Sequence, residues 1–171
     1  MDELDIATVP GWVAFRAAML KEHPEWADYF EVDGPGDRRP GSLCLRIPSV
    51  HPQIREPLTV EVPDRELGGG PIDVYWHRYF FEHVFLNRRI DLATAAEQRF
   101  ARILKLVERC LDDSLVFTEP FEIAPRGRIS YGLVPFPLPE EMKDRARKCN
   151  ARIVYWSWRG NLDGEWHPSD A

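Results

Sequence analysis

The sequence predicts an α+β fold with a mostly antiparallel sheet, because its strand and helix patterns fall in neighbouring groups. Three short strand patterns precede one long amphipathic helix, and two further strand patterns follow that helix directly. Strands that succeed one another without intervening helices pair as hairpins. We therefore expect one sheet of about five to six strands, covered by a long helix over residues 91–113 and by N-terminal and short C-terminal helices.

The N-terminal region predicts helix. Pro10 suits a first helical turn, where its missing N–H is no loss, and Thr8 is placed to cap it. Trp12, Phe15 and Met19 then recur at helical spacing and indicate a buried stripe. Residues 25–30 continue with about one more turn, and glycines and prolines make residues 33–42 a loop.

Short strands are expected at residues 43–47 and 58–62, because prolines 48, 52, 57 and 63 bracket them. Residues 73–86, DVYWHRYFFEHVFL, are dense in aromatic and β-branched residues and predict one further strand. Its more continuous face is the expected core face. That face runs through Tyr75, His77, Tyr79, Phe81, His83 and Phe85.

The helix over residues 91–113 has a single apolar stripe, and Thr94 and Glu97 match the spacing of a capping box. Beyond it, residues 115–123 and 128–136 predict a hairpin, residues 140–150 a short helix, and residues 151–158 a last strand. The expected organisation is one domain over residues 1–171. It comprises an acidic helical part, 1–32, and a part with the sheet and covering helices, 43–165.

Composition indicates a cytoplasmic protein. The 171 residues are 44% hydrophobic, without the roughly 18 consecutive apolar residues of a membrane span. The acidic start, Met1 to Asp5, lacks the basic and apolar regions of a secretory signal. Cys44, Cys110 and Cys149 are widely spaced, as reduced core thiols are.

The net charge of −6 is concentrated at the N-terminus, because residues 1–37 contain nine acidic and two basic residues. Such a region repels nucleic acid and attracts a basic partner, or simply forms a solvated face. Arg88-Arg89, Arg126, Arg128 and the bases of residues 143–148 are the features that favour nucleic-acid binding. The pI of 5.4 and the acids at 140, 141 and 144 oppose it.

No catalytic, metal or cofactor site is predicted. His77 and His83 share a face of a strand, but six residues separate them by roughly 20 Å, too far for one metal ion. Neither Ser130 nor Ser157 lies in a GxSxG motif, and Cys44 lies between two leucines, where a thiol is inert.

The C-terminal stretch of Trp156, Trp158, Arg159 and Asp163 is rich in residues that dominate protein interfaces. On a strand the two tryptophans would lie side by side, and Arg159 would stack or pair with Asp163 across the turn.

A family resemblance rests on two short motifs. They are a Trp-His-x-Tyr-Phe strand (Trp76, His77, Tyr79, Phe80) and a Ser-Trp-x-Gly-x-x-Asp turn (Ser157, Trp158, Gly160, Asp163). Together with the long helix, these resemble small bacterial α+β proteins of the kind that act as immunity proteins in polymorphic toxin systems. The resemblance covers roughly residues 58–165 and brings no catalytic residue with it.

The leading hypothesis is therefore a non-enzymatic binding protein, an immunity-type inhibitor of a bacterial toxin with no cofactor. Its candidate partner-binding residues are Glu25, Asp28, Glu31, Trp156, Trp158, Arg159 and Asp163. One alternative is a small hydrolase-like or metal-dependent enzyme that uses His77 with Asp73 or Glu82. Another is a structural protein that forms homo-oligomers through its aromatic strands.

Overall fold

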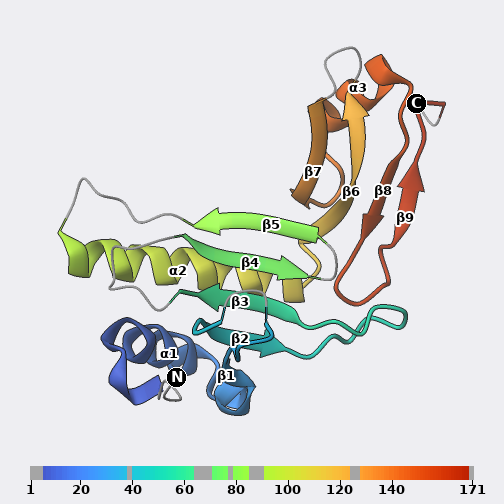
Figure 1. The fold of residues 1–171 in the computed structure, drawn as a ribbon. Coiled ribbons are helices and arrows are strands. Elements are labelled where there is room, and N and C mark those ends of the chain that lie inside the picture. The colour runs from blue at the N-terminus through green and yellow to red at the C-terminus, as the bar shows by residue number, and fades with distance from the viewer. Residues whose placement is uncertain are drawn as a thin grey trace.

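A computed structural model describes residues 6–37, 40–63, 71–76, 79–84, 91–123 and 128–169. The fold is α+β, but its strands form two antiparallel sheets, of five and four strands, where the sequence predicted one (Figure 1). The helical elements are η1 (Ile6–Thr8), α1 (Pro10–Glu22), η2 (Pro24–Tyr29), α2 (Leu92–Leu111) and α3 (Glu140–Cys149). The strands are β1 (Phe30–Val32), β2 (Leu43–Ile47), β3 (Leu58–Val62), β4 (Ile72–Trp76), β5 (Tyr79–Val84), β6 (Leu115–Ile123), β7 (Arg128–Pro135), β8 (Ile153–Trp156) and β9 (Gly164–Trp166).

The first sheet is an antiparallel meander in the order β1-β2-β3-β4-β5. Leu45 pairs with Val60, and Val60 pairs with Val74, so these three side chains share one face. Two helices cover this face, because α1 contributes Trp12, Phe15 and Met19 to the same core as Ile103 and Val107 of α2. The cover is thus shared between the N-terminal helix α1 and the long helix α2.

The stretch 73–86 is not one strand. β4 ends at Trp76 and β5 begins at Tyr79, and the two strands pair with each other. His77 and Phe85 lie outside the described residues. Within β4 the predicted core face is wrong, because Val74 and Trp76 lie next to the apolar residues of β3 and are buried, whereas Tyr75 is half-buried. The apolar face of the neighbouring strand therefore decides which side chains point inward, whatever the local aromatic density.

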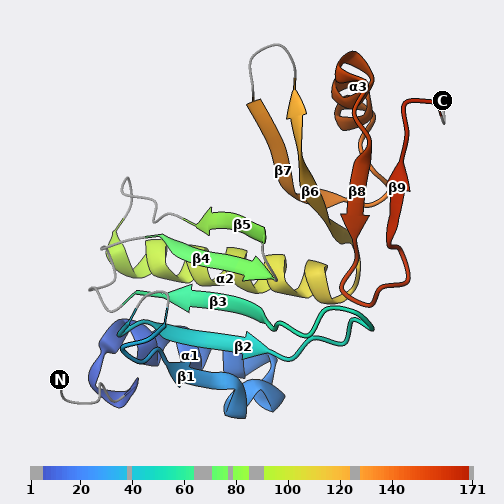
Figure 2. The same cartoon turned by 45° about the vertical axis from the view of Figure 1, so that its right-hand side comes forward.

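The second sheet has the order β7-β6-β8-β9 and stands beside the end of the first (Figure 2). Its strand β6 faces two cores. Leu115 and Phe117 belong to the large core beneath the first sheet, whereas Val116 packs with Met142 and Ala146 of α3. Alternation along one strand therefore joins the two halves of the fold.

Local signals explain smaller differences from expectation. The carboxylate of Asp91 caps α2 by accepting a 3.0 Å hydrogen bond from the Thr94 N–H. The expected capping box, with Thr94 as the cap and Glu97 as its partner, is therefore wrong, because the helix begins about one turn before Thr94. β8 ends at Trp156, two residues before the expected end at residue 158, because the Ser157 N–H bonds to the side chain of Asp163.

No helix within the described ranges is long and apolar enough to cross a membrane.

Candidate functional site

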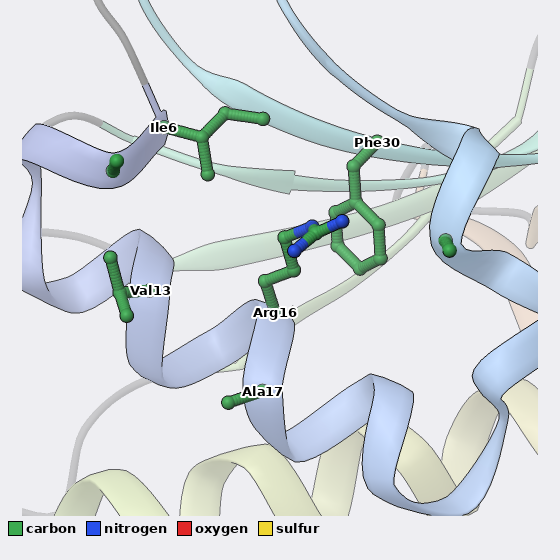
Figure 3. Close-up of a pocket in the computed structure, with 7 residues that line it drawn as sticks. Ile6, Val13, Arg16, Ala17 and Phe30 are labelled. Carbon is green, nitrogen blue, oxygen red and sulfur yellow. The ribbon is translucent and has the colours of Figure 1, made fainter.

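A hollow of about 390 Å³ opens between η1, α1, η2 and the start of β1 (Figure 3). Its walls are mostly apolar, and Val13 on its rim is 45% exposed. The Arg16 guanidinium lies over the Phe30 ring, with Cζ 5.6 Å from the ring centroid. The lining residues are Ile6, Ala7, Val13, Arg16, Ala17, Ala27 and Phe30.

Two of the predicted acidic residues lie on the helical segment beside this hollow. Glu25 and Asp28 are both exposed on η2, and Asp28 directly follows Ala27 of the lining. Glu25 forms a 2.9 Å hydrogen bond with His23, and this bond lowers the pKa of the Glu25 carboxyl. The His23 ring in turn stacks on Trp26 at 3.8 Å. The negative charge therefore lies on η2, the element that contributes Ala27 to the lining of the hollow.

Glu31, the third predicted acid, points to the other face of the first sheet. It pairs with Cys44 in the register, whereas Phe30 of the hollow pairs with Leu45. The Arg46 guanidinium donates hydrogen bonds to the carboxylates of Glu31 and Asp33. Burial opposes the charged form of Arg46, but these two bonds outweigh it and raise the pKa. The charge of Glu31 is therefore matched within the protein.

The predicted C-terminal residues lie where the two sheets meet. Trp158 is 3% exposed and packs against Trp76, with 5.2 Å between ring centroids. Trp156 is half-buried, and its indole N–H donates a 3.3 Å hydrogen bond to Glu119. The expected pairing of Arg159 with Asp163 is wrong, because Nε of the Arg159 side chain lies 4.0 Å from Oδ2 of Asp113, and its backbone N–H bonds to the same carboxylate at 3.1 Å. Most of these side chains are occupied in internal packing.

Asp163 joins the second sheet to the loop between β2 and β3. Its Oδ2 is 2.7 Å from Nε2 of His51, and its Oδ1 accepts a 2.7 Å hydrogen bond from the Ser157 N–H. Nδ1 of His51 accepts the N–H groups of Gln53 and Ile54, each at 3.0 Å. Nε2 must then carry the ring proton and donate to Asp163. Sequence reasoning missed His51, because no local pattern relates residues 112 positions apart.

The His51, Asp163 and Ser157 group has the residue types of a hydrolytic triad but a different arrangement. In such a triad the histidine lies between the serine and the acid and accepts the serine proton. Here Asp163 lies in the middle, and hydrogen bonds already occupy both ring nitrogens of His51. Ser157 is also fully buried. The group is therefore suited to fixing a turn against a loop.

Other reactive side chains are held inside the protein. Burial, with a smaller effect of Asp33, raises the pKa of the Cys44 thiol, and burial likewise raises that of Cys110. The Tyr75 hydroxyl donates a 3.4 Å hydrogen bond to Glu61, and burial raises its pKa. Such shifts keep these groups protonated at neutral pH.

The alternative enzymatic residues are only partly placed. Asp73 is fully buried on β4, His77 lies outside the described residues, and the backbones of Glu82 and His83 belong to β5. His83 pairs with Asp73 in the register. Over the described parts of the chain, no three His, Cys, Asp or Glu side chains are grouped to hold a metal ion.

Comparisons of this chain with family models, curated proteins and solved structures return no match.

Proposed function

We propose that this protein binds a basic partner protein through its N-terminal surface and acts as an immunity-type inhibitor of a bacterial toxin. We define the N-terminal surface as Val13, Glu25, Ala27, Asp28 and Phe30. The observation that carries the proposal is the apolar hollow of about 390 Å³ together with the exposed carboxylates of η2, which also contributes Ala27 to the lining. The proposed binding is non-enzymatic and needs no cofactor.

The two parts of this surface serve different steps of binding. Carboxylates at residues 25 and 28 attract a positively charged partner and speed the first encounter. The hollow then accepts an apolar side chain of that partner, and Val13 and Phe30 lose contact with water. A few such anchors supply most of the affinity of a protein interface.

The N-terminal surface replaces the C-terminal residues as the favoured contact. Trp158 is in the core, and Asp163 is bonded to His51, so neither can reach a partner without breaking the junction of the sheets. Glu31 is likewise occupied by Arg46. Of the predicted partner-binding residues, Glu25 and Asp28 are the two that support the proposal most directly.

The test begins with affinity capture from the native host, using the wild-type chain and the double variant Glu25→Lys/Asp28→Lys. The matched control is Glu97→Lys/Asp144→Lys, which makes the same charge change at exposed sites on α2 and α3. For the captured partner, we expect the N-terminal variant to associate about tenfold more slowly at low salt, and the difference to shrink as salt rises.

A second readout addresses the immunity role. Cells that express the captured partner should stop growing, and co-expression of the wild-type chain should restore growth. The variant Val13→Asp, which places a charge on the rim of the hollow, should restore growth less well because the complex dissociates faster. Equal association rates for the wild-type chain, the N-terminal double variant and the control double variant would contradict the proposal. So would a captured partner that is not toxic.

A further inference from the structure

A second hollow, which we call the basic groove, lies between the C-terminal half of α2 and the strands β6 and β7. Its volume is about 550 Å³. It adjoins the connection between the two sheets and shares no lining residue with the N-terminal hollow. The lining residues are Ala101, Arg102, Lys105, Leu106, Arg109, Leu115, Leu133 and Pro135.

The charge of this groove is positive, although the whole chain carries −6. Arg102, Lys105 and Arg109 are three and four residues apart on α2, so they lie within about 60° of one another around the helix. Among the described residues that line it, none is acidic. Glu108 is turned about 100° from Arg109 and bonds to His23, and Asp112 accepts the Ser114 N–H.

The floor of the groove is aliphatic. Leu115 is 4% exposed, whereas Leu106 and Leu133 are half-buried and form the accessible part. The volume suits one or two apolar side chains more than a whole folded domain. The described lining residues include no aromatic ring on which a nucleic-acid base could stack.

We propose that the basic groove binds an acidic segment of a partner protein. An aliphatic side chain of that segment occupies the hollow over Leu106 and Leu133, and carboxylates on either side bind Arg102, Lys105 and Arg109. A protein segment fits better than a nucleic acid, because the acidic N-terminal region repels a long polyanion. This inference is independent of the function proposed for the N-terminal surface.

The test is fluorescence anisotropy with a labelled peptide of about twelve residues, four repeats of Glu-Asp-Leu, added to the full chain. We expect a Kd of roughly 10–100 μM at low salt, weakening as salt rises. The variant Arg102→Glu/Lys105→Glu should weaken binding at least tenfold. Both sites are exposed and glutamate is a good helix former, so circular dichroism should show the fold intact.

Two controls and a comparison with RNA make the result specific. Arg55→Glu/Lys148→Glu makes the same charge change at exposed sites away from the groove and should leave the affinity unchanged. A peptide with serine in place of leucine should bind about tenfold more weakly, because the aliphatic floor is then unused. Absence of peptide binding, equal loss in both charge variants, or equal affinity for the serine peptide would overturn the proposal. Tighter binding of a single-stranded RNA of the same length would overturn it in favour of a nucleic-acid site.

Discussion

His51 and Asp163, 112 residues apart in the chain, are joined by a 2.7 Å hydrogen bond between Nε2 and Oδ2. The bond connects the loop before β3 to the turn before β9, and His51 lies edge-on to Trp76 and Trp156 as well. Because the His51 side chain is fully buried, its polar atoms depend on these partners for hydrogen bonding.

The first prediction concerns this bond. Asp163→Asn keeps the shape of the side chain but removes its charge and one of its two acceptor oxygens, so either His51 or the Ser157 N–H loses its partner. We expect a loss of about 1–3 kcal/mol in the free energy of unfolding, measured by urea titration with tryptophan fluorescence. Asp144→Asn removes only an exposed ion pair with Arg147 on α3 and should have little effect. Equal stability of both variants would show that the bond contributes nothing.

Replacing Gly160 with alanine should destabilise the fold. Its φ is +73°, and a Cβ atom there would lie 2.7 Å from Cδ of Pro52, which follows His51. We expect Gly160→Ala to cost about 1 kcal/mol or more in thermal or urea unfolding. Gly36→Ala is the matched control, since a Cβ there meets nothing within 4 Å. A neutral Gly160→Ala variant would contradict the packing of the turn against the loop.

The thiols should differ in reactivity. Burial raises the pKa of both Cys44 and Cys110, and the thiolate is the reactive form. Cys149 is only half-buried. Titration of the native protein with a disulfide reagent near pH 8 should modify one thiol rapidly, and all three after unfolding. In Cys149→Ser the rapid phase should disappear, and its persistence would show that a buried thiol is accessible.

The cap of α2 should make stability depend on pH. Hydrogen bonding to the backbone of Thr94 lowers the pKa of Asp91 from its ordinary 3.8. A lowered pKa in the folded state adds stability above the ordinary value, and this contribution is lost as pH falls through the folded value. Asn also caps helices but does not titrate in this range.

Asp91→Asn should therefore unfold at a lower temperature than wild type at pH 7, and the two should converge as pH falls below 3.8 and through the lowered pKa of the folded state. Asp91→Ala removes the cap itself and should be less stable than Asp91→Asn throughout. Circular dichroism at 222 nm follows these transitions. A constant difference between wild type and Asp91→Asn over this pH range would exclude the proposed role of the charge.

Local signals in the sequence were sufficient for several elements. The predicted bounds of β2, β3 and β6 are confirmed, because prolines and side-chain alternation act within a few residues. The face of each strand that points to the core was predicted less well. The core face of β4 depends on its register with β3, and no pattern inside residues 73–86 contains that information.

The division into two sheets was also outside the reach of sequence reasoning. Leu115, Val116 and Phe117 read as one apolar run, and only their three-dimensional neighbours reveal that they serve two cores. The bond between His51 and Asp163 has the same origin. For the candidate site, charge patterning indicated Glu25 and Asp28, whereas the hollow beside them arises from segments that meet only in the folded chain.

The two-sided strand β6 has a consequence for truncation. Neither core is complete without it, because Phe117 lies 4.5 Å from Trp76 between ring centroids while Val116 packs under α3. A fragment that ends with α2 would leave Trp76 open to solvent and should aggregate when expressed. Calorimetry of the intact chain should accordingly record one heat-absorption peak, with both sheets melting together.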